Sequence, residues 1–137
     1  MINYKTDDLA SKLDELCPEG IDVYFDNVGG ETLDTVMWRL ALGARVILCG
    51  LISQINQGQR PNGPNPATII KARATVRGLV VFDHWGRMGE MLDTFVPMIA
   101  DGRIKFREDV SEGLAAAPAA FSRLMSGQNF GKTIIRL

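Results

Sequence analysis

Segments that favour strands alternate along this chain with segments whose apolar residues recur at helical spacing, and this alternation restricts the possible folds. Strand formers dominate residues 21–26, 45–49 and 75–82, and shorter strands are predicted at residues 107–110 and 132–137. Between them, helical spacing occurs at residues 9–16, 33–40, 67–72, 91–99 and 119–125. This order predicts an α/β fold in which helices flank a parallel sheet.

Local signals mark where several of these elements begin and end. Thr6-Asp7-Asp8 is typical of a helix start, and Pro118 is expected to open the last helix at its first turn. Pro97 lies inside a predicted helix, where it is expected to kink the helix or to break its hydrogen bonding. The strand at residues 45–49 is apolar almost throughout, so we expect it to be covered on both faces.

Composition argues against several classes of protein. The chain has 137 residues, of which 46% are apolar and 23% charged, an ordinary balance for one globular domain. The net charge of −1 gives no general attraction to nucleic acid or to a membrane surface. Without a signal sequence or an apolar run of membrane-spanning length, the sequence predicts a cytoplasmic protein. Two cysteines and one histidine are too few for a Cys-rich zinc site, so no metal is expected.

Three segments follow directly after predicted strands, at residues 26–30, 49–53 and 81–84. Ligands of open parallel sheets bind outside the carboxyl ends of the strands, so these segments form the candidate site. Neither G-x-G-x-x-G nor G-x-x-x-x-G-K-[ST] occurs, and spacing alone does not separate a nucleotide site from ordinary turns. Cys49 is either a nucleophile or a small residue at a strand end, and His84 beside Asp83 is either an acid–base pair or an exposed turn. The second interpretation is favoured for both.

Six short segments of the chain form a more specific pattern. They are INYKT at 2–6, GIDVYFDNVGGETLD at 20–34, RVILCGLISQ at 45–54, RGLVVFD at 77–83, DGRIKFRED at 101–109 and NFGKTIIRL at 129–137. In this order they resemble the zinc-independent, NADPH-dependent branch of the medium-chain dehydrogenase/reductase superfamily. That branch includes prostaglandin and leukotriene reductases, plant alkenal double-bond reductases and bacterial curcumin reductases. The resemblance covers essentially the whole chain.

The resemblance implies an NADPH-dependent oxidoreductase that reduces the carbon–carbon double bond of α,β-unsaturated ketones and aldehydes. Hydride would pass to the β-carbon, and a proton would reach the α-carbon from a neighbouring donor or water. The expected partners are NADP(H) and a small enone or enal substrate, without nucleic acid or membrane. A homodimer is expected, paired through the strand edge at residues 75–82. The alternatives are a quinone reductase of the same superfamily and a non-catalytic nucleotide-binding or dimerisation module.

The resemblance also assigns cofactor contacts wherever the motifs match. The tyrosine of the NYK motif, near the adenosine phosphate end of NADP, is Tyr4, and the asparagine of the DNVGG motif is Asn27. A further asparagine contact near the C-terminus is Asn129. The loop along the nicotinamide half comprises Cys49, Gly50, Leu51, Ile52, Ser53, Gln54 and Ile55, and the stretch after the next strand begins with Leu79, Val80 and Val81. No catalytic residue is assigned, because Ile55 stands where the family commonly has a tyrosine and isoleucine cannot donate a proton.

Members of this branch are well over twice as long, so the resemblance implies a C-terminal piece of such an enzyme. Residues 1–100 would be the C-terminal part of an NADP-binding Rossmann domain, and residues 101–137 would return toward a missing catalytic domain. Residues 1–4 would end the third strand of a 3-2-1-4-5-6 sheet. With its first strands absent, the strand at residues 21–26 would have an open edge, which favours pairing with another chain. We therefore expect this chain alone to be catalytically inactive.

Overall fold

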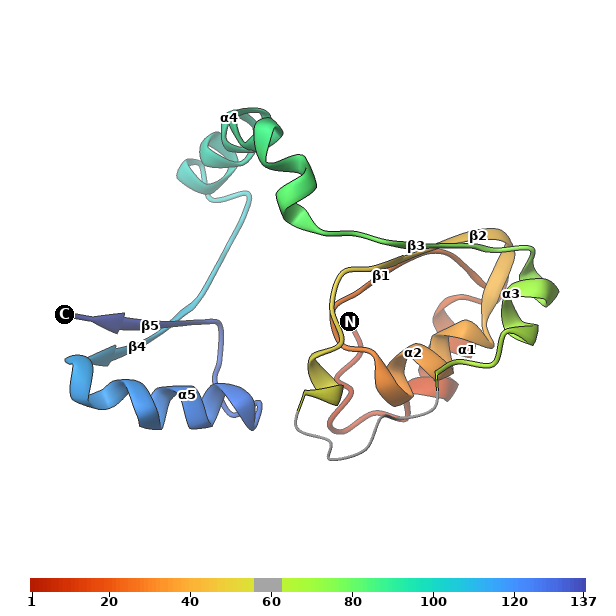
Figure 1. Ribbon diagram of the computed structural model, residues 1–137, viewed down its shortest axis with the longest axis horizontal. Helices are drawn as coiled ribbons and strands as arrows, with labels where there is room; N and C mark the ends of the chain where they lie inside the picture. The colour runs from red at the N-terminus through yellow and green to blue at the C-terminus, as the bar shows by residue number, and fades with distance from the viewer. Residues whose placement is uncertain (56–62) are drawn as a thin grey trace. The chain divides into compact units, whose positions relative to one another are not determined.

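The computed structural model describes residues 1–55 and 63–137, which divide into two compact units, Met1–Trp85 and Gly86–Leu137 (Figure 1). Each unit has its own sheet. The predicted domain boundary at residue 100 stays a prediction, because contacts within this chain do not define the domains of a longer protein.

The first unit is built around a three-stranded parallel sheet in the order β1-β2-β3 (Figure 1). The strands are β1 (Ile21–Asp26), β2 (Leu40–Leu48) and β3 (Thr75–Gly78). Asp26 pairs with Leu48, and Leu48 pairs with Gly78, so all three strands end level. The predicted α/β fold with a parallel sheet is confirmed, and the segments after the strands leave the sheet at one edge.

Helices α2 (Gly30–Met37) and α3 (Ala67–Ala72) pack on one face of this sheet, and α1 (Leu9–Leu16) packs against α2. The 3-10 helices η1 (Ile52–Gln54) and η2 (Val81–Arg87) follow β2 and β3. Leu33 and Met37 of α2 form the core with Val46 of β2, and Ile69 of α3 packs against it. The predicted start of α1 is confirmed, because the Asp8 carboxylate accepts a 2.7 Å hydrogen bond from the Ser11 N–H.

The opposite face of the sheet is bare among the described residues. Val23 and Phe25 of β1 are 54% and 53% exposed. Along β2, Ala44 and Val46 are buried whereas Arg45 between them is exposed. The prediction that this strand is covered on both faces is therefore wrong for the described chain. In the described sheet β1 pairs with β2 alone, and the open edge expected for β1 stays a prediction.

Several predicted boundaries differ from the structure. β2 begins at Leu40, not at residue 45, because Leu40 pairs with Ile21 and leaves the preceding helix. β3 ends at Gly78, where its partner β2 also ends, and does not continue to residue 82. Residues 1–4 do not form a strand: the Asn3 carbonyl accepts hydrogen bonds from the N–H groups of Thr6 and Asp7, which makes a turn.

The second unit combines two helices with a two-stranded parallel sheet. Its elements are α4 (Met88–Ala100), β4 (Glu108–Glu112), η3 (Leu114–Ala116), α5 (Ala117–Met125) and β5 (Lys132–Arg136). Val110 of β4 pairs with Ile134 of β5. Pro118 lies in the first turn of α5, as predicted, and α4 continues through Pro97 to Ala100. Within the described ranges, no helix combines the length and apolar character needed to cross a membrane.

Candidate functional site

The chain segments that leave the three strands of the first unit stay hydrogen-bonded beyond the sheet. The Asp26 carbonyl accepts hydrogen bonds from the N–H groups of Cys49 and Gly50, at 2.8 and 3.1 Å. The Leu79 N–H donates to the Leu48 carbonyl at 2.9 Å. The structure therefore brings the predicted segments after β1 and β2 together at one edge of the sheet, whereas the Leu79 bond lies at the end of β3 and does not involve the predicted segment at residues 81–84.

A buried carboxylate organises the first of these segments. Asp26 is 1% exposed, and its Oδ1 atom accepts hydrogen bonds from the N–H groups of Val28 at 2.7 Å and Gly29 at 3.1 Å. The Gly29 N–H also lies 3.1 Å from Oδ2. Partial burial, together with the charge and hydrogen bonding of this carboxylate, raises the pKa of the neighbouring Tyr24 phenol. Sequence reasoning missed this role of Asp26, although an aspartate before Asn-Val-Gly-Gly is typical of a side-chain-stabilised turn.

The segment after β1 is joined to the segment after β2 by a second set of hydrogen bonds. The Ile52 N–H donates to the Asn27 carbonyl at 3.1 Å. Both the backbone N–H and the Oγ of Ser53 donate to the Val28 carbonyl, at 3.0 and 2.6 Å. Because these bonds satisfy backbone carbonyls, the two loops form one surface with a defined conformation.

Glycines allow the two loops to approach this closely. Gly29 and Gly30 have φ angles of +71° and +58°, which side-chain-bearing residues rarely adopt. A Cβ at Gly29 would lie 2.7 Å from Leu51 Cδ2, and a Cβ at Gly30 would lie 2.8 Å from Ser53 Oγ. The φ angles therefore favour glycine at both positions, and a Cβ at either would displace the side chain of Leu51 or Ser53.

The loops at residues 26–30 and 49–55 together form the loop pair. The outer side of the loop pair presents small and apolar groups to solvent. Asn27 is exposed next to Gly50, while Cys49 is half-buried and carries a free thiol. The large apolar side chains of Leu51, Ile52 and Ile55 are also exposed on this side, as are those of Val80 and Val81 in the segment after β3. This surface can bind a flat ligand that has apolar faces and amide or hydroxyl groups at its edges.

Tyr4 lies elsewhere in the first unit, in a pocket of about 280 Å³ beside the starts of α1 and α2. Asp7, Asp8 and Glu31 also line this pocket, and their carboxylates are unfavourable neighbours for a phosphate. The cofactor contact assigned to Tyr4 stays a prediction.

Asn129 belongs to the second unit, between α5 and β5. Its Nδ2 donates a 2.9 Å hydrogen bond to the Gly131 carbonyl, which fixes the local turn. The cofactor contact assigned to Asn129 also stays a prediction. Across the described residues, no three His, Cys, Asp or Glu side chains gather in a way that could hold a metal ion.

Comparison with known proteins places the chain in a family. Residues 1–135 match the family model described as zinc-binding dehydrogenase. The chain is 36% identical to an NADPH-dependent curcumin reductase of Escherichia coli, with 99% of this chain and 41% of the relative covered. It is 40% identical to an NADP(+)-dependent 2-alkenal reductase of Nicotiana tabacum, with 97% and 39% covered.

A solved structure is similar over the same extent. The crystal structure of CurA in complex with NADPH from Vibrio vulnificus aligns with a TM-score of 0.87 and 42% identity, covering 98% of this chain and 42% of that chain. The chain therefore spans about two-fifths of the length of these relatives. The family resemblance of the six sequence segments is confirmed, and the chain belongs to the zinc-binding dehydrogenase family.

Proposed function

We propose that the protein to which this chain belongs is a cytoplasmic NADPH-dependent oxidoreductase. It reduces the carbon–carbon double bond of α,β-unsaturated ketones and aldehydes. The observation that carries the proposal is the hydrogen-bonded loop pair at the carboxyl ends of β1 and β2, in a chain 42% identical to a protein crystallised with NADPH. The names of the curcumin and alkenal reductases support the substrate class.

The residues of the loop pair fit the nicotinamide half of NADP(H). Gly50 lies beside Asn27, because a Cβ at Gly50 would be in ordinary contact with the Asn27 carbonyl oxygen at 3.4 Å. The exposed Asn27 carboxamide offers donors and an acceptor for an amide or a ribose. Leu51, Ile52, Val80 and Val81 supply apolar surface that excludes water from a flat ring. The cofactor supplies a hydride when bound, and the protein positions it.

The family description names zinc, but the described residues do not fit a zinc site. They contain no group of three potential metal ligands, so no step of the reaction is derived through a metal. We propose a zinc-independent reaction, in which backbone and side-chain groups orient the substrate.

The loop pair provides no evident proton donor at its outer end. Ile55 follows η1 directly and exposes a hydrocarbon side chain. We propose that the proton for the substrate α-carbon comes from water or from a group outside this chain.

A dimerisation module is the second candidate function, and a specific observation favours it. β3 ends the described sheet, and all four of its residues, Thr75–Gly78, are exposed. An exposed strand edge pairs readily with an identical edge of a second copy. We propose that the whole protein is a homodimer joined at this edge.

Titration of the purified chain with NADPH, followed by the fluorescence of the reduced nicotinamide, separates the two candidates. We expect saturable binding with a Kd on the order of micromolar, well within the range of small-molecule affinities. Asn27→Ala should weaken it about tenfold, the equivalent of one lost hydrogen bond to ligand. Asp22→Ala, at the exposed start of β1, is the matched control and should not change it.

Absence of saturable binding would leave the dimerisation module as the better candidate.

A separate activity test mixes the purified chain with NADPH and an enone such as 3-nonen-2-one. We expect no consumption of NADPH by the chain alone, and measurable reduction would contradict its proposed inactivity.

A further inference from the structure

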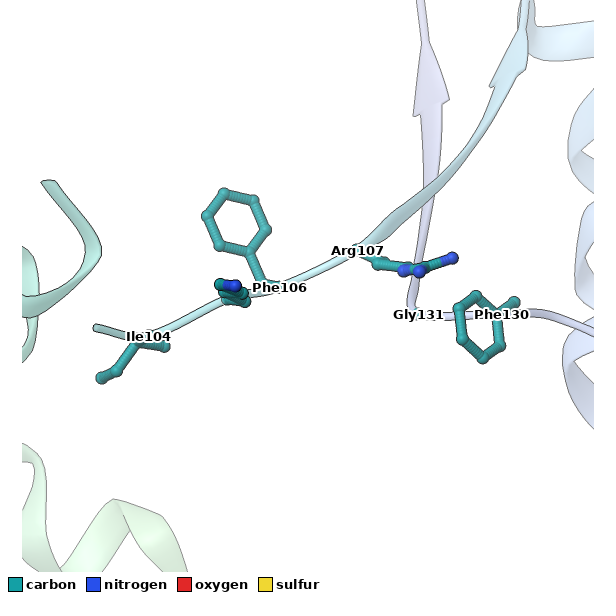
Figure 2. Close-up of a pocket in the computed structure, with 6 residues that line it drawn as sticks. Ile104, Phe106, Arg107, Phe130 and Gly131 are labelled. Atoms are coloured by element: carbon teal, nitrogen blue, oxygen red, sulfur yellow. The ribbon is translucent and has the colours of Figure 1, made fainter. Parts of the chain in front are cut away.

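The second unit contains a pocket of about 730 Å³ whose lining belongs entirely to that unit. Figure 2 shows the residues that line it, Ile104, Lys105, Phe106, Arg107, Phe130 and Gly131. They come from the segment before β4 and from the turn before β5.

The backbone holds these two segments together tightly. The Lys132 N–H donates a 2.8 Å hydrogen bond to the Arg107 carbonyl. Gly131 has a φ angle of +95°, and a Cβ there would collide with the same carbonyl. The pocket is therefore formed at a fixed crossing of two chain segments.

The pocket is cationic. The Arg107 guanidinium lies over the Phe130 ring, 4.7 Å from its centroid, as Figure 2 shows. Neither Arg107 nor Lys105 forms an ion pair within the described ranges, and no carboxylate lines the pocket. By contrast, Arg103 of the same unit is paired with Asp101. Two cations are thus left available to an anion.

The pocket also exposes aromatic surface. Phe106 is 63% exposed and Phe130 is 67% exposed, and Ile104 adds an aliphatic wall. Aromatic rings contribute large apolar area and favour flat partners. A guanidinium that stacks on a ring still has its edge N–H groups free for a carboxylate.

We propose that this pocket binds a small carboxylate attached to an aromatic or conjugated body. The carboxylate pairs with Arg107 and Lys105, and the flat body lies against the Phe130 ring. This inference is independent of the proposed function, because the loop pair of the first unit contributes no residue to the pocket.

The test uses the full chain labelled with ¹⁵N and titrated with trans-cinnamate, while amide chemical shifts are recorded. We expect saturable shifts at the amides of Arg107, Phe130 and Gly131 with a Kd on the order of 1 mM, as small ligand size allows. Cinnamamide, which has the same shape without the charge, should bind about tenfold more weakly. Equal binding of the two compounds would overturn the proposal.

Variants then identify the groups responsible. Arg107→Gln should weaken cinnamate binding about tenfold, and Arg107→Lys, which keeps the charge without the planar fork, by a smaller factor. Lys132→Gln removes a cation outside the pocket and should have no effect. The dispersed amide spectrum of each variant verifies its fold. Unchanged affinity in Arg107→Gln would refute the assignment, as would displacement of cinnamate by NADPH, since that result gives the pocket to the cofactor.

Discussion

Asp26 offers a sharp test of how the loop pair is held together. Asp26→Asn keeps the size of the side chain and one oxygen acceptor, but removes the charge and replaces the other oxygen with an amide donor. In the native chain the carboxylate accepts hydrogen bonds from the N–H groups of Val28 and Gly29, and both Asp26 and Gly29 are buried. With its oxygen at the position of Oδ1, the asparagine weakens the two hydrogen bonds at that atom and places its amide donor against the Gly29 N–H at the position of Oδ2.

The expected loss of unfolding free energy in Asp26→Asn follows from the difference between a charged and a neutral hydrogen-bond acceptor. A hydrogen bond to a charged group contributes about 1.5–3 kcal/mol and a neutral one about 0.5–1.5 kcal/mol, so two affected bonds lose about 2 kcal/mol together. Asp26→Ala removes the acceptor for both N–H groups and should cost about 3–5 kcal/mol, because each buried N–H left without a partner costs about 1–3 kcal/mol. Asp22→Asn, on the same strand but exposed, should change stability by less than about 0.5 kcal/mol.

Urea unfolding followed by tryptophan fluorescence measures these differences. Trp38 and Trp85 both belong to the first unit, so their emission reports on the unit that contains Asp26. With a urea dependence of about 1–2 kcal/mol per M, Asp26→Asn should lower the midpoint by about 1–2 M. If Asp26→Asn and Asp22→Asn unfold at the same midpoint, the carboxylate does not organise the loop and the reasoning fails.

Two further predictions concern other parts of the chain. Gly131→Ala should destabilise the second unit by about 2–4 kcal/mol, since it adds a backbone collision to the strain of a positive φ angle. Gly102→Ala, at φ +78° with open space around it, should cost only about 1 kcal/mol, and equal circular-dichroism melting of the two variants would refute the collision. Partial burial and the nearby Asp26 raise the pKa of Tyr24 above its ordinary value, so the folded state retains the phenol proton longer than the unfolded state. The contribution of Tyr24 to the free energy of unfolding should thus be fully present below about pH 10 and decrease as the pH rises further. Tyr24→Phe should remove that part of the decrease. Identical pH dependence of unfolding in the native chain and in Tyr24→Phe would contradict this.

The fold could be read from the sequence where local chemistry decides it. Asp8 caps α1 and Pro118 lies in the first turn of α5, because both act on their own helix end. The strand at residues 21–26 agrees with β1, since strand formers alternate there.

The missed boundaries depend on pairing that sequence pattern does not encode. Leu40 fits the helical spacing of α2, but pairing with Ile21 places it in β2. The strand after Thr75 stops at Gly78 because its neighbour β2 offers no further partner after Leu48. In these cases the register of the sheet overrides local preference.

The sequence selected the loops at the carboxyl ends of β1 and β2 as the candidate site, which stays a prediction, but it did not reveal the hydrogen bonds that hold these loops together. The rule that ligands bind at the carboxyl ends of parallel strands was enough to select the segments after β1, β2 and β3. Asp26 was missed because its carboxylate bonds to backbone N–H groups and carries no catalytic motif. Tyr4 and Asn129 came from family motifs alone, and their cofactor contacts are still to be tested.

Amide chemical shifts of the ¹⁵N-labelled chain, recorded during titration with NADPH, test most directly whether the loop pair binds the cofactor. We expect saturable shifts that are largest at the amides of Asn27, of residues 49–55 and of residues 79–81, with much weaker shifts in Asn27→Ala. Shifts that do not saturate, or that saturate only at residues remote from the loop pair, would contradict cofactor binding by the loop pair.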